Sequence, residues 1–113
     1  MTNYLISFPS GAMDVADEEL EEVGRDAHQV LRQAKEAGAW VFGGGIDETV
    51  PAVRVASDGQ IIEGPYPVNQ QLSGGFAILE LATRAEAEAW AARFAAACRC
   101  PQELREFMYD SES

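Results

Sequence analysis

Ile61-Ile62-Glu63-Gly64-Pro65-Tyr66-Pro67-Val68-Asn69-Gln70-Gln71-Leu72-Ser73-Gly74-Gly75-Phe76 is the stretch of sequence that decides how this chain folds. Gly64-Pro65 fixes a bend, and Gly74-Gly75 permits a close backbone approach or a conformation barred to other residues. A connector that only reverses the chain is shorter and more polar. With the acid Glu63 directly before the bend, the stretch also indicates where a functional site lies.

Strand patterns flank this stretch on both sides. Alternating residues at 53–56, an Asp-Gly turn at 57–60 and a short return at 60–63 predict a hairpin. The apolar run at 76–81 predicts a strand buried on both faces for most of its length. Other strands are expected at 4–8, 40–42 and 104–109.

Two helices complete the pattern. The first is expected from about residue 17 to 37, because acids fill its first turn and apolar residues recur at three- and four-residue spacing. Gly38 stands where a helix C-cap belongs. The second is expected from residue 84 to about 97, after a capping box formed by Thr83 and Glu86.

The resulting order is β-α-β-β-α-β with one added hairpin, which is the split βαβ, ferredoxin-like pattern of the α+β class. We expect one domain over residues 1–113, with an antiparallel sheet and two helices on one of its faces. The other face then exposes alternate apolar side chains of residues 4–8, 53–55 and 76–81. The economical way to cover it is a homodimer with the two sheets packed about a twofold axis.

The net charge of the chain argues against two classes of binding partner. Nineteen acids against eight basic residues give a net charge of −11, which repels phosphate backbones and anionic membrane surfaces. Nucleic acid and membrane are therefore not expected as partners. No stretch is apolar enough to span a membrane, and the start of the chain lacks a signal-peptide pattern. We expect an acidic cytoplasmic protein.

Cys98 and Cys100 are separated by a single residue. This spacing suits neither a redox pair nor a zinc ligand pair, and no second ligand cluster accompanies it. Two reduced thiols are expected, with no metal and no cofactor. Gly43-Gly44-Gly45 is not a dinucleotide-binding fingerprint, because a strand and not a helix is expected to follow it. A close backbone crossing is the simpler interpretation.

Taken together, these features resemble the YCII-related family, whose signature is Asp-Gly-Pro-Phe followed by Gly-Gly-aromatic. The resemblance covers nearly the whole chain, including the first helix with its histidine, the glycine-rich strand and the Gly64-Pro65-Tyr66 segment. It implies a dimeric α+β barrel of the ferredoxin type. It also implies that the helix histidine, here His28, and the acid of the motif, here Glu63, line a cavity.

The chain departs from the family pattern at several positions. Glu63 stands where the family has Asp, and Tyr66 stands where it has Phe. Val68-Asn69-Gln70-Gln71 replaces a Glu-Thr-Lys-Glu stretch, so the Lys and both acids of that stretch are absent. These departures leave the fold expectation unchanged but weaken any charge-based chemistry carried over from the family.

His28 is the only histidine of the chain and is a candidate general acid or base, because its pKa lies near neutrality. The alternative is a half-buried helix histidine bonded to a neighbour. Glu63 is its candidate partner, since a carboxylate fixes the imidazole tautomer and raises its basicity; the alternative is an exposed acid at a strand end. We hypothesise that His28, Glu63 and Tyr66 meet in one cleft.

Further residues are candidates for binding a ligand. Trp40 offers an aromatic wall, although an aromatic residue in a strand is also a common core residue. Asn69 and Gln71 offer neutral hydrogen bonds that orient a polar ligand, whereas Gln70 is better explained as part of a solvated loop.

Two functions remain open from the sequence. The first is a small cytoplasmic enzyme that uses His28 and Glu63 for proton transfer on a small organic molecule. The second is a noncatalytic dimer that binds a small ligand or a regulatory protein through the same cavity. The sequence does not decide whether the protein is an enzyme.

Overall fold

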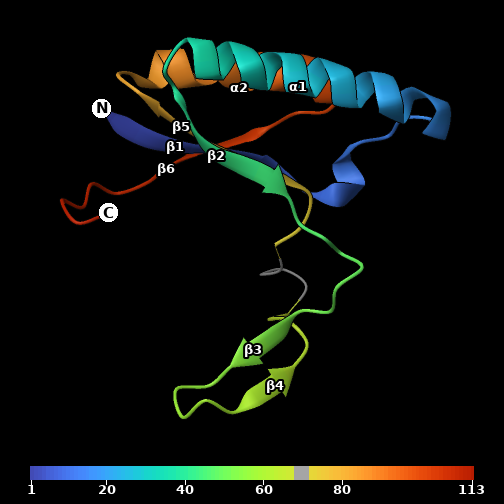
Figure 1. Cartoon of the computed structure of the whole chain (residues 1–113), viewed down its shortest axis with the longest axis vertical. Coiled ribbons are helices and arrows are strands. Elements are labelled where there is room, and N and C mark those ends of the chain that lie inside the picture. The colour runs from blue at the N-terminus through green and yellow to red at the C-terminus, as the bar shows by residue number, and fades with distance from the viewer. Residues whose placement is uncertain (68–71) are drawn as a thin grey trace.

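Two helices cover one face of a four-stranded antiparallel sheet, and a separate hairpin stands away from that sheet (Figure 1). This computed structural model describes residues 1–67 and 72–113. In chain order the elements are β1 (Thr2–Phe8), the 3₁₀ turns η1 (Ser10–Ala12) and η2 (Asp17–Glu19), α1 (Leu20–Glu36), β2 (Trp40–Gly45), β3 (Val53–Val55), β4 (Ile61–Glu63), β5 (Gly75–Leu81), α2 (Arg84–Cys98) and β6 (Glu103–Glu106).

The strand order in the main sheet is β2-β5-β1-β6. Each helix therefore follows a central strand, β1 or β5, and leads to an edge strand, β2 or β6, as the ferredoxin-like pattern requires. The expected α+β class is confirmed. One expectation is wrong: within the described residues β3 and β4 pair only with each other, so Val53 and Val55 add nothing to the uncovered face of the main sheet.

The core lies between the sheet and the helices. Ile6 of β1 and Leu79 of β5 are the large side chains most completely buried, at 1% and 0% exposure. Along β5, Ala77, Leu79 and Leu81 are buried while Glu80 is exposed. The expectation that this strand is buried on both faces is therefore wrong. The helices cover one face only, so the strand alternates between buried and open positions.

Capping residues fix the ends of the helices. Gly38, at φ +74°, follows α1, and its N–H donates to the carbonyl of Lys35 at 3.0 Å. Thr83 Oγ1 accepts from the Glu86 N–H at 3.2 Å at the start of α2. The Glu86 carboxylate accepts from the N–H of Ala82, the residue before the N-cap Thr83, at 3.2 Å, which is a one-residue variant of the capping box. Both predicted caps are confirmed.

Two glycines allow close approaches between strands. Gly74 has φ +79°, and a Cβ there would lie 2.0 Å from the carbonyl oxygen of Phe8. The turn into β5 therefore needs glycine where it meets the end of β1. A Cβ at Gly43 of β2 would lie 2.8 Å from the carbonyl oxygen of Phe76 on β5 and 2.4 Å from the ring of Trp40. The predicted close approaches are confirmed at both positions.

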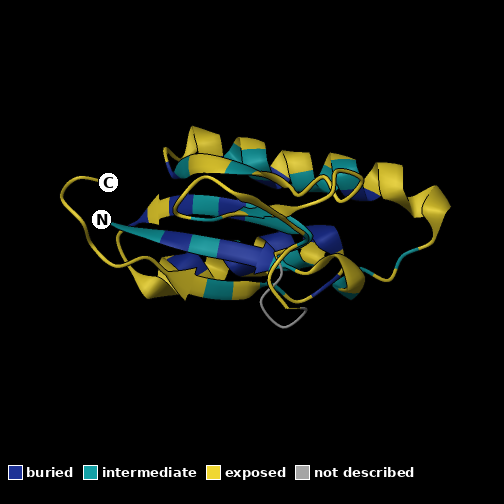
Figure 2. Cartoon of the chain, turned by 90° about the horizontal axis from the view of Figure 1, so that it is seen from below, coloured by how far each residue is buried: buried dark blue, intermediate teal, exposed yellow. Residues whose placement is uncertain are grey.

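The hairpin β3–β4 belongs to a segment that we call the arm, residues 46–67. Its turn forms as predicted, with Gly59 at φ +89° and the Ala56 N–H donating to Gln60 O at 2.8 Å. The arm leaves the sheet from the edge strand β2 and lies on the side away from the helices (Figure 1). Most of its residues are exposed, whereas buried residues gather along the strands under the helices (Figure 2).

Neither α1 nor α2 is both long and apolar enough to cross a lipid bilayer, and the same holds for the rest of the described chain.

Candidate functional site

A cavity of about 400 Å³ opens between α1 and the sheet, at the end where β1 finishes and β5 begins. Its walls are mostly apolar and come from both helices, the loop before α1 and three strands. The lining residues are Ile6, Phe8, Met13, Leu20, Val23, Gly24, Ala27, His28, Leu31, Trp40, Gly44, Gly45, Gly75, Phe76, Ala77, Phe94, Cys98 and Gln102.

Small residues on two facing walls create this space. Gly24 and Ala27 stand on the face of α1 that turns toward the sheet, and Gly44, Gly45 and Gly75 stand opposite. A Cβ at Gly24 would meet no atom within 4 Å, so the space beside this part of α1 is open. The apolar stripe of α1 is therefore interrupted where the cavity lies, and Gly24 leaves room beside His28.

His28 lies at the rim of the cavity, on α1, with an exposed side chain. Among the described residues that line the cavity, it carries the only imidazole, a group able to accept and donate a proton. No hydrogen bond from a described residue fixes its imidazole in one orientation. Trp40 forms part of the inner wall and packs against Phe94, with ring centroids 6.5 Å apart. The structure thus brings two of the predicted site residues, His28 and Trp40, into one cavity.

Cys98 and Gln102 add polar atoms that the sequence interpretation did not assign to a site. Burial raises the pKa of the Cys98 thiol, so the thiol stays protonated near neutral pH and is a poor nucleophile. The Gln102 side-chain amide donates to the carbonyl of Cys100 at 3.2 Å. The spacing of Cys98, one helical turn after Phe94, is a sequence signal that puts the two residues on the same face of α2, but the sequence interpretation did not use it.

Glu63 and Tyr66 do not line this cavity; both belong to the arm. Tyr66 lies in a separate hollow with Arg54, whose guanidinium carbon is 5.7 Å from the tyrosine ring centroid. Glu63 is exposed and pairs with Val53 across the hairpin. Because the hairpin does not join the main sheet, its return strand does not run toward α1. The described chain therefore does not bring His28, Glu63 and Tyr66 into one cleft.

The remaining candidates, Asn69 and Gln71, lie outside the described residues.

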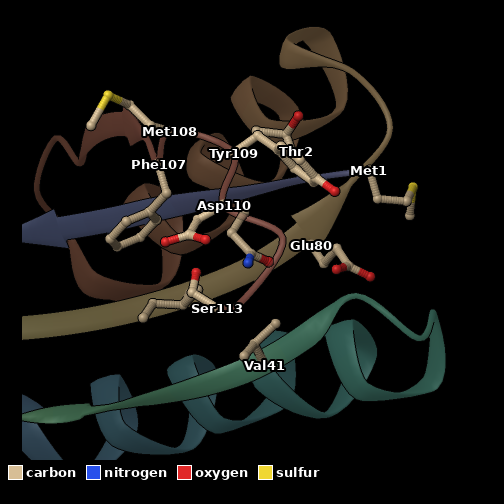
Figure 3. Close-up of a pocket in the computed structure, with 11 residues that line it drawn as sticks. Met1, Thr2, Val41, Glu80, Phe107, Met108, Tyr109, Asp110 and Ser113 are labelled. Atoms are coloured by element: carbon tan, nitrogen blue, oxygen red, sulfur yellow. The ribbon is translucent and has the colours of Figure 1, made fainter.

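A second hollow, of about 340 Å³, lies on the face of the sheet away from the helices (Figure 3). The C-terminal residues Phe107 to Asp110 cross its mouth, and Val41 and Glu80 line it from the strands. The side-chain oxygen of Asn3 is buried there without a partner among the described residues. In the described part of the chain, His, Cys, Asp and Glu side chains form no group of three that is able to hold a metal ion.

Comparison with known proteins gives a family and a fold. None of the curated proteins compared with the chain matches it. Among solved structures, the fold is similar to 5-chloro-2-hydroxyhydroquinone dehydrochlorinase (TftG) from Burkholderia phenoliruptrix AC1100, in complex with 2,5-dihydroxybenzoquinone. The TM-score is 0.51 and the identity 14%, over 97% of each chain. The model of the YCII-related domain matches residues 4–99, so the chain belongs to the YCII-related family.

Proposed function

We propose that the cavity beside α1 binds a small, flat, largely apolar organic molecule and that His28 exchanges a proton with its polar edge. One observation carries this proposal: an apolar cavity has, at its rim, a histidine whose imidazole is able to accept and donate a proton. Its volume of about 400 Å³ lies within the usual range for small-ligand sites. Trp40 supplies an aromatic surface for a flat ligand.

The chemistry available to this arrangement is general acid–base catalysis without a redox change. A ring nitrogen of His28 takes a proton from a ligand hydroxyl, and the imidazolium returns it to another atom of the same molecule. TftG is seen in complex with 2,5-dihydroxybenzoquinone, which supports hydroxylated quinones as the first probes. At 14% identity the similarity is one of fold, so it guides the choice of probe and not of reaction.

The test combines binding with turnover. Calorimetry with 2,5-dihydroxybenzoquinone should detect binding to the unaltered protein, with NMR following conversion of hydroxylated quinones and quinols. We expect His28→Gln to abolish conversion while Gln29→Ala, on the neighbouring exposed position, leaves it unchanged. Conversion that persists in His28→Gln contradicts the catalytic role. Absence of binding by every hydroxylated aromatic tested contradicts the proposed ligand class.

A noncatalytic binding protein is the second candidate, and a specific observation favours it. No carboxylate of the described residues lines the cavity, and the expected partner Glu63 lies on the arm. Within the described chain, His28 therefore lacks the acid that would fix its tautomer and raise its basicity. Under this alternative, the unaltered protein and His28→Gln both bind the probe and neither converts it.

The proposal includes a homodimer formed through the face of the sheet that the helices leave open. Phe42 is 67% exposed on this face, and Leu5 and Ile78 are partly exposed beside it. Apolar side chains gathered on one open sheet face are typical of a surface that a partner covers. Two free, buried thiols support a reducing compartment such as the cytoplasm.

A further inference from the structure

The chain exposes more surface than a compact molecule of its size. Its accessible surface is 8010 Å², whereas a compact monomer of 12.3 kDa exposes about 6,100 Å². Its radius of gyration is 15.8 Å, against about 13 Å for a compact domain of this length. The excess of roughly 1,900 Å² exceeds the ~800 Å² that each partner buries in a typical stable complex.

The arm carries a disproportionate share of the exposed apolar groups. Among the described residues, fifteen large apolar side chains are exposed, and seven of them belong to the arm. The arm holds only about a fifth of the chain. The seven are Ile46, Val50, Val53, Val55, Ile61, Ile62 and Tyr66. An isolated two-stranded hairpin with three-residue strands is marginally stable in water.

The arm is nevertheless organised for contact. At its base, the Ile46 N–H donates to Gly74 O at 2.9 Å, and Ser10 Oγ donates to the Glu48 carboxylate at 3.1 Å. Along its length, Arg54 Nε donates to Gly64 O at 3.1 Å. These bonds set the direction in which the arm leaves the sheet and reduce the entropy that would be lost on binding.

The arm and the open sheet face border the same space. The arm starts at the edge strand β2 and extends on the side of the sheet away from the helices (Figure 1). On the same side Phe42 is exposed, and Ile78, which pairs with it, is partly exposed. An occupant of this space contacts two apolar surfaces at once. A second copy of the chain fits because a twofold axis lets each copy give one arm and receive one.

We propose that the arm clasps a second copy of this chain, its Val53, Val55 and Ile61 side chains packing on the partner across the dimer interface. This inference rests on the homodimer of the proposed function and adds the arm to its contacts. It explains how a chain of net charge −11 self-associates, because apolar burial opposes the like-charge repulsion. Salt screens that repulsion, so the dimer should tighten as ionic strength rises.

The experiment compares two variants that add the same charge at different places. Val55→Glu adds a carboxylate to the arm, and Gln29→Glu adds one to the exposed surface of α1. Sedimentation velocity should show a dimer at micromolar concentration for the unaltered chain. We expect the dimer Kd to rise at least ~10-fold in Val55→Glu, since the interface would then bury an unpaired charge, and to change less than ~3-fold in Gln29→Glu.

Isotope-filtered NMR on a mixed sample of labelled and unlabelled unaltered chains supplies a readout independent of any variant. Cross-peaks from the methyl groups of Val53, Val55 or Ile61 to the other copy are expected. A dimer without such cross-peaks, and with equal Kd in the two variants, overturns the role of the arm and leaves the homodimer standing. A monomer at every concentration instead overturns the homodimer itself.

Discussion

Two regions of the molecule, the sheet covered by its helices and the arm, contain similar apolar residues. These residues are buried in the first region and exposed in the second. In the sheet, Ile6 and Leu79 are 1% and 0% exposed because α1 and α2 cover them. In the arm, Val55 and Ile61 also occupy strands, yet they are 64% and 58% exposed. The two hydrophobic patterns differ little. The difference lies in whether a second layer of the same chain covers the strand.

This contrast separates two kinds of structural requirement. Packing within one chain stabilises the body, defined as residues 1–45 and 72–113, and the cavity with His28 is set into that packing. The arm lacks such a layer among the described residues, so we assign its apolar residues to contact with another molecule. Substitutions in the body should change the free energy of unfolding, and matching substitutions in the arm should change assembly.

The largest effect is expected for removal of a core side chain from the body. Leu79→Ala should lower the free energy of unfolding by about 3–4 kcal/mol, because it removes buried methyl groups and leaves a cavity. Ile61→Ala in the arm should lower it by less than ~1 kcal/mol in dilute protein. Urea unfolding measured at several protein concentrations gives both values. Equal losses at low concentration would contradict the division between body and arm.

Two glycines with similar backbone angles should differ in their sensitivity. Gly74→Ala should destabilise the protein by at least about 2 kcal/mol, because its new Cβ would lie 2.0 Å from Phe8 O at φ +79°. Gly59 in the arm turn also has a positive φ, +89°, but a Cβ there would have no neighbour within 4 Å. Gly59→Ala should therefore lower the free energy of unfolding by only about 1 kcal/mol, through backbone strain. Thermal melts of the two variants make the comparison, and a smaller loss at Gly74 would refute it.

The smallest effect concerns pH. Burial raises the pKa of the Cys98 and Cys100 thiols above their values in the unfolded chain. The folded state therefore favours the protonated thiols, and this contribution to stability is complete below the unfolded-state pKa, about 8.5. It is lost as pH rises through the folded-state pKa. Unfolding of the unaltered protein and Cys98→Ala between pH 7 and 10 should show a shallower decline in the variant.

Much of the fold followed from local signals that do not depend on distant parts of the chain. The cap at Thr83, the turn at Gly59 and the close approach at Gly74 all follow from residue chemistry at one position. The residues of the site were harder to predict, because contact between His28 and Glu63 depends on where the hairpin lies relative to α1. Nothing in residues 53–63 tells a strand that joins the main sheet from one that leaves it.

The direct test of whether the site belongs to the body is an NMR titration with 2,5-dihydroxybenzoquinone. His28 is the only histidine, so its ring signal is unambiguous, and Trp40 reports on the inner wall of the same cavity. The titration is run on the unaltered protein and on Val55→Glu. We predict that the probe shifts the His28 and Trp40 ring signals equally in both. Shifts confined to Tyr66 and the arm, with His28 and Trp40 unmoved, would place the site on the arm and contradict the account.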